Sequence, residues 1–291
     1  MLGSKPDLAA VLGWLVEAGA EEAVCDSAID RFTAAPVGAS AAPATLAAPM
    51  RIDGRGSPPA AGPPPLPSSA PAAKIVSAPP ADSIGRAMEI AAACNSLAEL
   101  KAAVEVFDGC SLKKFATNTV FADGTPRHGI MLIGEAPGRD EDLAGLPFVG
   151  RAGKLLDKML AAIGLDRKKN AYITNVMNWR PPDNREPSPE EAASCLPFLR
   201  RHVELARPKV IVLLGAVAAR HVMGKTDGIM RLRGKWLEYY VNGAMIPVMP
   251  TLHPAYLLRR AIDKRLAWRD LQSIAAKVNS LKLLETDGGH R

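Results

Sequence analysis

The sequence predicts an α/β protein built around a parallel sheet, and three observations support that prediction. Short apolar runs at residues 130–134, 171–175, 210–215 and 246–252 have the length of buried strands. The stretches between them show helical periodicity, so each strand leads to the next through a crossover. Each run ends in a polar or glycine-bearing loop. We therefore expect a three-layer α/β/α sandwich around a central four-stranded parallel sheet, formed by residues 84–285.

The residues before this region have a different composition. Apolar residues recur at helical spacing in DLAAVLGWLVEAGAEEAV, which predicts a short amphipathic helix within residues 1–32. This helix is too short and too acidic to cross a membrane. It could pack locally, contact another copy or dock a protein partner. Residues 33–83 are dominated by Ala, Pro, Gly and Ser and contain no aromatic residue, so we expect a disordered linker.

Charge separates the same two regions. Residues 1–82 carry 5 Lys and Arg against 8 Asp and Glu, a net of −3, whereas the remaining residues carry 31 against 22, a net of +9. A basic folded region suits a polyanion such as nucleic acid. The four cysteines form no close framework, and no signal peptide is present, so we expect reduced thiols in a bacterial-type cytoplasm, with activity on the nucleoid. Residues 286–291 are expected to be a tail.

Two helices of the predicted domain can be placed from local signals. In SPEEAASCLPFLRRHVELA, Ser188 is the expected N-cap, Pro189 occupies the first helical position and Glu191 completes a capping box. The segment GKLLDKMLAAIG has amphipathic spacing typical of a helix. These helices supply the crossovers before the second and third strands.

The loops after the strands contain residues capable of chemistry. The segments are GEAPGRDED, NVMNWRPPDNREP, GAVAA and HPAYLLRR, in chain order. Parallel strands joined by crossovers end at one edge of the sheet, so a carboxylate cluster, an asparagine and a histidine should converge there. The alternative is that these are ordinary βα loops, but function concentrates at such edges. We expect the active site at this edge.

Three longer segments carry a resemblance to a known family. They are GEAPGRDEDLAGLPFVGRAGKLLDKMLAAIGLDR, AYITNVMNWRPPDNREPSPEEAASCLPFL and TLHPAYLLR, and in unbroken order they resemble the uracil-DNA glycosylase superfamily over roughly residues 108–275. The resemblance is strongest to family 4, the iron-sulfur branch. It implies a monofunctional DNA-repair glycosylase that hydrolyses the N-glycosidic bond of uracil flipped out of DNA and leaves an abasic site. We expect the protein to be a monomer.

Other functions stay open on sequence alone. The enzyme could accept a broader range of deaminated bases, such as hypoxanthine or xanthine. It could instead be a metal-dependent DNA-processing enzyme that holds a divalent ion with Asp140, Glu141 and Asp142, or a non-catalytic DNA-binding relative. The family also has a branch that traps DNA covalently through a histidine in a basic insertion. PPDNREPSPEE has neither the insertion nor the histidine, so turnover is expected.

The proposed chemistry needs a carboxylate near the sugar. Cleavage of the glycosidic bond develops positive charge on the deoxyribose, which a carboxylate can stabilise while it positions the attacking water. Glu135, Asp140 and Glu141 are the candidates, and the resemblance places Glu135 first, Glu141 second and Asp140 third. Ala136 stands where family 1 enzymes have an aspartate. Asp142 is expected to be a solvated charge at the start of a helix.

The resemblance also assigns residues around the base. His253 would donate a hydrogen bond to the uracil oxygen, Asn175 would pair with the uracil edge through its amide, and Phe148 would stack on the flipped base. Leu257 aligns with the apolar wedge that family 1 enzymes insert into the DNA. The base pocket would be completed by Gly134, Ala136, Pro137 and Gly138, and DNA would be contacted by Arg139, Arg151, Arg185, Pro254, Leu257, Arg259 and Arg260.

The cysteines depart from the family 4 pattern. Family 4 proteins hold a four-iron cluster with four cysteines, and Cys110 and Cys195 match two of them. Phe107 and Trp179 occupy the other two ligand positions, and neither side chain can ligate iron. We therefore predict no cofactor and no metal, with apolar packing in the cluster's volume; the alternative is a 4Fe-4S cluster with a different ligand set.

Overall fold

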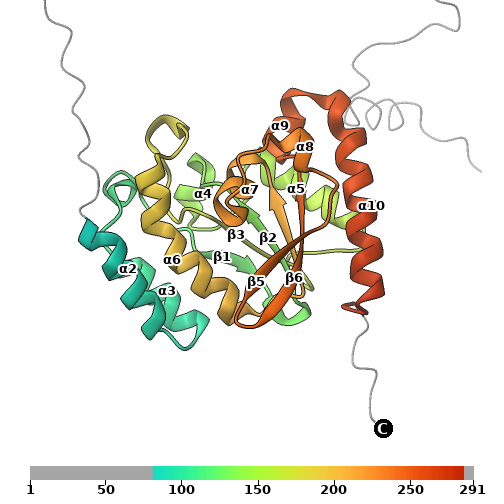
Figure 1. Ribbon diagram of the computed structural model, residues 1–291. Coiled ribbons are helices and arrows are strands. Elements are labelled where there is room, and N and C mark those ends of the chain that lie inside the picture. The colour runs from blue at the N-terminus through green and yellow to red at the C-terminus, as the bar shows by residue number, and fades with distance from the viewer. Residues whose placement is uncertain (1–80, 285–291) are drawn as a thin grey trace, which may run out of the picture. The chain divides into compact units, whose positions relative to one another are not determined.

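The computed structural model describes residues 81–284, which form a six-stranded sheet in the order β1-β3-β2-β4-β6-β5 (Figure 1). The central strands pair in parallel, which confirms the predicted parallel sheet at the core. Two short strands, β1 and β5, extend it at the edges in antiparallel pairing. The parallel strands are β2 (Ile130–Gly134), β3 (Tyr172–Asn175), β4 (Val210–Leu214) and β6 (Ala244–Thr251).

The expectation of four strands missed the two edges for different reasons. The edge strand β1 (Ala122–Gly124) reads ADG, which has no apolar run, and pairs with β3 only through three residues. The other edge strand, β5 (Leu237–Val241), alternates partly buried and exposed residues, as expected for an edge strand with one solvated face. It joins β6 through a tight turn at Asn242 and Gly243, both with positive φ.

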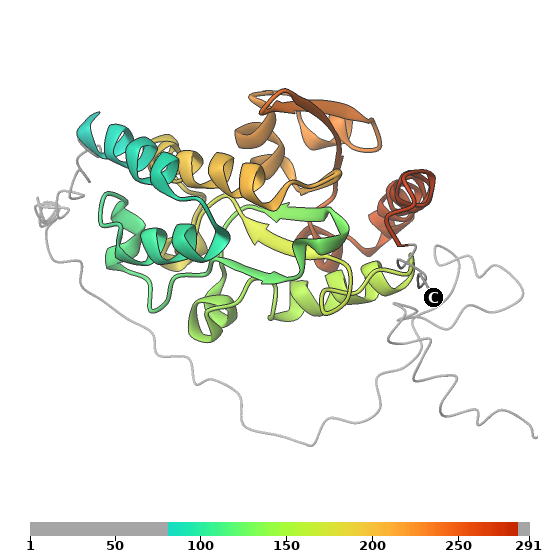
Figure 2. The same cartoon turned by 90° about the horizontal axis from the view of Figure 1, so that it is seen from below.

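The sheet separates two apolar layers, and its own alternation explains them. Met131 and Ile133 of β2 face one layer, and Ile130 and Leu132 face the other. The first layer is covered by α2, α3, α6 and α7, and the second by α5, α9 and α10. Figure 2 shows the teal α2 and amber α6 on one side of the sheet and the yellow-green α5 on the other. The three-layer prediction is confirmed.

The helix bounds follow the capping signals in the sequence. At the start of α6, Ser188 accepts from the Glu191 amide, the Glu191 carboxylate accepts from the Ser188 amide, and Pro189 is the first helical residue, as predicted. The helices are α2 (Ala81–Ala93), α3 (Leu97–Val106), α4 (Arg139–Ala144), α5 (Arg151–Ala161), α6 (Pro189–Ala206), α7 (Ala216–Met223), α8 (Ile229–Leu232), α9 (Pro254–Arg259) and α10 (Lys264–Ser280). Short 3-10 turns are η1 (Ser111–Lys114), η2 (Pro126–His128), η3 (Pro182–Asn184) and η4 (Ala261–Asp263).

The N-terminal predictions are tested only at their boundary. Helix α2 begins at Ala81, so the last three residues of the predicted linker 33–83 are helical, and Ser83 is buried. The amphipathic helix expected within residues 1–32 lies outside the described residues. Between residues 81 and 284, no helix is long and apolar enough to cross a membrane.

The topology sets the position of the site. Strand β2 lies between β3 on one side and β4 on the other. The chain therefore passes from β2 to β3 on one side of β2, and the connection from β3 to β4 then crosses to its other side. Loops diverge at the carboxyl ends of strands where the winding reverses, and such points form the ligand crevices of open α/β sheets. The GEAPG loop follows β2 at this point.

Candidate active site at the carboxyl edge of the sheet

A cleft of about 490 Å³ opens where β2, β3 and β6 end. Loops from all three strand ends contribute to it, as the topology predicts. Several of the predicted site residues line this cleft. They include the base-contact candidates Phe148, Asn175 and His253 and the carboxylates Glu135 and Glu141. The full lining is Glu135, Ala136, Pro137, Gly138, Glu141, Phe148, Ala152, Asn175, Pro181, Asn184, Arg185, His253, Ala255, Tyr256 and Arg259.

Asn175 presents an unused acceptor to this cleft. It is the last residue of β3 and is 2% exposed. Its Oδ1 is the buried side-chain oxygen that has no hydrogen-bond partner within the described part of the chain. A buried polar atom without a partner costs about 1–3 kcal/mol, so such an atom at a cleft indicates a missing ligand donor.

Gly134 provides the space beside this amide. A β-carbon at position 134 would lie 2.4 Å from Asn175 Oδ1 and 2.5 Å from Phe148 Cζ. Both distances are far below van der Waals contact, so any larger residue would push the amide or the aromatic ring out of place. The predicted place of Gly134 in the base pocket therefore has a steric basis.

His253 is neutral and has a defined tautomer. It is the N-cap of α9, and its Nδ1 accepts a hydrogen bond from the Ala255 amide at 3.1 Å. Burial, with a smaller contribution from the positive charge of Arg259, lowers the pKa of His253 to about 4. Because Nδ1 is an acceptor, the single ring proton is on Nε2. His253 thus offers one N–H donor to the cleft at neutral pH.

Phe148 forms an aromatic wall in an unusual backbone conformation. Its side chain is 5% exposed, and its ring centroid lies 5.6 Å from that of His253. Its φ is 55°, in the left-handed region that bulky residues rarely adopt. The ring therefore lines the cleft, together with Asn175 and His253, through a backbone conformation that its surroundings must maintain.

The three candidate carboxylates have different environments. Glu135 lines the cleft, and its carboxylate makes no hydrogen bond or ion pair with another described residue. Burial raises the pKa of Glu135, Glu186 adds to the rise, and the positive charge of Arg220 opposes it. Asp140 is exposed and lies outside the cleft lining. Glu135 is the candidate with an available carboxylate in the cleft.

Glu141 is occupied by backbone amides. Its Oε1 accepts from the Val149 and Gly150 amides at 2.9 Å each, and its Oε2 accepts from the Gly138 amide at 3.1 Å. These bonds join the start of α4 to the loop that carries Phe148. The geometry therefore favours loop positioning for Glu141 over water activation.

The expectation for Asp142 is wrong. Instead of being solvated, its side chain is 3% exposed, and Oδ1 accepts from the Thr117 and Asn118 amides at 2.8 and 3.1 Å. It anchors the segment before β1. Because Asp142 is turned to these amides, it does not join Asp140 and Glu141 in the metal site considered from sequence. Residues 81–284 contain no group of three or more His, Cys, Asp or Glu side chains that could hold a metal ion.

The predicted DNA-contacting residues divide by exposure. Arg259 and Arg185 line the cleft, but the Arg185 guanidinium is paired with Glu191 through two hydrogen bonds of 2.8 and 2.7 Å. Arg139, Arg151 and Arg260 are exposed outside the lining, and Pro254 is buried.

Burial favours the neighbour of Leu257 over Leu257 itself as a wedge. Leu257 is 1% exposed and packs in the layer beneath α9. Its neighbour Leu258 is 42% exposed. On a helix, adjacent residues point about 100° apart, so a shift of one position exchanges the buried and exposed roles.

The residues at the family 4 cluster positions do not fit a four-thiolate cluster. Phe107 and Trp179 are 2% and 1% exposed, and Trp179 Nε1 donates to Thr119 Oγ1 at 3.0 Å. The Cys110 and Cys195 thiols are in contact, with Sγ atoms 3.9 Å apart. Four thiolates are the normal ligand set, and two aromatic side chains here belong to the apolar layer.

Sequence reasoning missed several lining residues. These are Ala152, Pro181, Asn184, Ala255 and Tyr256. All five lie inside the motif segments, so their neighbourhood was predicted although their side-chain directions were not. Asn184 has a φ of 53°, which an asparagine tolerates in a turn and which no apolar pattern reveals.

Comparisons with known proteins place the chain in a family. A sequence model described as the uracil DNA glycosylase superfamily matches residues 121–272. The chain is similar to a type-4 uracil-DNA glycosylase of Archaeoglobus fulgidus, with 48% identity over 52% of this chain and 77% of that protein. It is also similar to type-4 enzymes of Sulfurisphaera tokodaii, at 39% identity over 62% of this chain and 84% of the relative, and of Thermotoga maritima, at 42% over 56% and 84%.

Proposed function

The chain belongs to the uracil-DNA glycosylase superfamily, and on that premise we propose that it is a DNA-repair enzyme that hydrolyses the N-glycosidic bond of uracil in DNA. The single observation that supports this most strongly is the unpartnered Oδ1 of Asn175 in the cleft. Uracil carries an N3–H donor beside its O4 acceptor, and an amide side chain can pair with both. A base turned out of the helix would supply the partner that Asn175 lacks.

Phe148 and His253 complete the recognition of the base. The Phe148 ring provides a stacking surface, worth about 1–3 kcal/mol for a nucleic-acid base. The Nε2–H of His253 is the donor for uracil O2, where negative charge accumulates as the glycosidic bond breaks. Because the imidazole is neutral, it donates this hydrogen bond without transferring its proton.

Glu135 acts on the sugar side of the broken bond. Its free carboxylate can stabilise positive charge at C1′ and orient a water molecule toward that carbon. The water oxygen forms the new bond to C1′, the electrons of the C1′–N1 bond leave with uracil, and the proton released by the water passes to Glu135 or solvent. The products are free uracil and an abasic site.

Two features support water as the nucleophile. The described cleft lining contains no lysine, so the amine that forms a Schiff base in bifunctional glycosylases is not at hand. The loop between β3 and α6, NVMNWRPPDNREP, contains no histidine that could capture the sugar covalently. Monofunctional turnover follows from both.

The test is base release from defined oligonucleotides. Single- and double-stranded DNA containing uracil, hypoxanthine, xanthine or a thymine mismatch is incubated with the full chain, and abasic sites are cleaved with alkali. We expect strand cleavage with uracil in at least one strand context and no protein–DNA band of increased mass on a denaturing gel. Release of no uracil under any condition overturns the proposal, and hypoxanthine or xanthine release at a comparable rate shows the broader range.

A further inference from the structure

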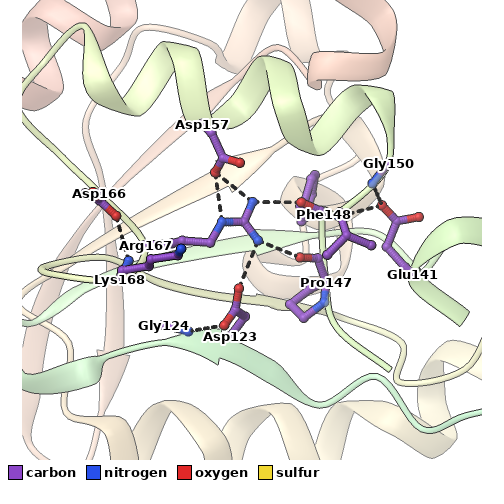
Figure 3. Close-up of polar contacts among 11 residues, drawn as sticks. Asp123, Gly124, Glu141, Pro147, Phe148, Gly150, Asp157, Asp166, Arg167 and Lys168 are labelled. Carbon is purple, nitrogen blue, oxygen red and sulfur yellow. Dashed lines mark hydrogen bonds and ion pairs between the residues drawn. The ribbon is translucent and has the colours of Figure 1, made fainter. Parts of the chain in front are cut away.

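Arg167 is a nearly buried cation outside the cleft, in the turn between α5 and β3. Its side chain is 10% exposed, and its guanidinium forms bonds in four directions (Figure 3). Nε donates to Asp157 Oδ1 at 2.8 Å, and one terminal nitrogen pairs with Asp123 Oδ2 at 3.0 Å. The remaining bonds go to two backbone carbonyls, those of Pro147 at 3.0 Å and Phe148 at 2.7 Å.

One of these carbonyls belongs to Phe148, whose ring lines the cleft, and the other to the residue before it. Phe148 holds a φ of 55°, which is strained for a residue with a β-carbon. Such a conformation persists only where its surroundings fix it. Arg167 binds the carbonyl side of this short loop, and Glu141 binds the amides of the next two residues at 2.9 Å each. Both sides of the Phe148 backbone are therefore held by charged groups.

Helix α5 adds a steric constraint on the same carbonyl. A β-carbon at Gly153 would lie 1.8 Å from the Phe148 oxygen, so only glycine allows the helix to approach this closely. The close approach leaves the Phe148 carbonyl pointing toward the Arg167 guanidinium. A lysine could not replace that guanidinium, because one ammonium cannot span two carbonyls and two carboxylates with the fixed geometry of a planar fork.

We propose that Arg167 is a positioning residue for base excision, which sets the Phe148 ring against the flipped base by fixing the carbonyls of Pro147 and Phe148. The proposal rests on the function proposed above. Arg167 touches neither substrate nor reacting atoms. The competing explanation is a purely structural ion-pair network, in which loss of Arg167 would weaken folding without acting through the Phe148 ring.

A double-mutant cycle separates these two explanations. Uracil release is measured under single-turnover conditions for Arg167→Lys, Phe148→Ala and the double variant. We expect Arg167→Lys alone to slow release about 10–100-fold, the scale of misplacing a bound reactant by an ångström. In the Phe148→Ala background the same change should cost less than threefold, and the affinity for undamaged DNA should stay within twofold of the wild type throughout.

A second variant disturbs the same carbonyl from the side of helix α5, and urea unfolding of every variant shows whether it folds. Gly153→Ala forces the Phe148 carbonyl, which would lie 1.8 Å from the new β-carbon, to shift relative to Arg167. Gly153→Ala should slow uracil release about 10–100-fold when Phe148 is present, and less than threefold in the Phe148→Ala background. Lys168→Ala, which removes an exposed cation from the same turn, is the matched control and should stay within twofold of the wild type.

Each outcome decides the matter. Equal fractional losses in the presence and absence of the Phe148 ring, or wild-type rates for both Arg167→Lys and Gly153→Ala, overturn the positioning role. If the wild type itself releases no uracil, the proposed function fails instead, and the two failures are thereby distinguished.

Discussion

The helix-capping role of His253 and the charge-stabilising role that we propose for it can be separated by substitution. Its Nδ1 caps α9 through the Ala255 amide, and its Nε2–H is the donor that we propose for the base, in a residue that lines the cleft. His253→Ser keeps a side-chain acceptor suited to an N-cap but removes the donor. His253→Ala removes both. The comparison therefore isolates the catalytic contribution from the structural one.

The magnitudes differ enough to be measured independently. Loss of a donor to a developing anion costs about 10²–10³ in rate, equivalent to about 2.7–4 kcal/mol of transition-state stabilisation. Loss of an N-cap costs about 1 kcal/mol of folding stability. Both variants should therefore release uracil about 10²–10³-fold more slowly, and His253→Ala should be about 1 kcal/mol less stable than His253→Ser.

The pH dependence supplies a second readout. With a pKa of about 4, only about one His253 ring in a thousand is protonated at pH 7, so the single-turnover rate should show no inflection near pH 6.5 from this group. The lowered pKa also means that folding stability from neutral His253 is complete above pH 6.5 and is lost as pH falls toward 4, by at most about 3 kcal/mol. His253→Ser should reduce that acid-dependent loss.

The assay is single-turnover release of uracil from an oligonucleotide between pH 5 and 9, with urea unfolding in parallel. A rate for His253→Ser within tenfold of the wild type would refute the donor role. A wild-type inflection near pH 6.5 that disappears in this variant would show instead that the imidazole is charged during catalysis.

Three further predictions use the same assay. Asn175→Leu should abolish detectable recognition of uracil while leaving stability equal or higher, because it removes a buried acceptor without a partner; a variant that is strongly destabilised but active contradicts this. Glu135→Gln should slow release by about 10²–10³-fold, whereas Asp140→Asn, which changes an exposed carboxylate, should stay within a few-fold; equal effects would refute the assignment. Leu258→Ala should slow release from duplex more than from single-stranded DNA with little change in stability, whereas Leu257→Ala should cost about 2–5 kcal/mol of stability; the reverse pattern, measured by urea unfolding, would restore Leu257 as the wedge.

Much of the fold and the site's location could be predicted because apolar runs and caps are local signals. The four central strands and the start of α6 at Ser188 follow from such signals. Asn175 and His253 were placed at one edge because strand direction fixes where each strand ends. The strand β1 could not be predicted, since its three residues pair with β3 through backbone hydrogen bonds that carry no side-chain pattern.

The roles of Glu141, Asp142 and Arg167 could not be predicted because they depend on the paths of the loops. Glu141 and Asp142 are adjacent in sequence, yet one accepts from the amides of the Phe148 loop and the other from the segment at residues 117–118. Both satisfy amides that the fold would otherwise bury without partners, which is a property of three-dimensional arrangement. Arg167 is the last residue of the first family-like segment, but the positioning role proposed for it depends on the left-handed backbone conformation of Phe148, which no sequence pattern indicates.

Aromatic side chains fill the space around the two positions where the family 4 resemblance implies cysteine ligands, Phe107 and Trp179. These positions lie at the end of α3 and in the segment after β3, and Cys195 of α6 matches a third. The Phe107 ring lies 4.9 Å from that of Phe198 of α6 in an edge-on arrangement, and Trp179 is buried in the same layer. Burial of each large ring stabilises the fold by about 25 cal/mol per Å² of apolar surface, and this contribution does not depend on a metal.

This packing predicts a protein without iron. The purified chain should be colourless and contain no iron by elemental analysis, and chelators should leave both uracil release and stability unchanged. Bound iron at a ratio near four per chain, with visible absorbance, would contradict the packing argument. Phe107→Ala or Trp179→Ala should destabilise the fold by about 3–5 kcal/mol, the usual cost of removing a large buried aromatic side chain. Such a loss would show that packing of these rings holds α3 and α6 against the sheet, beside the β3 strand end that carries Asn175.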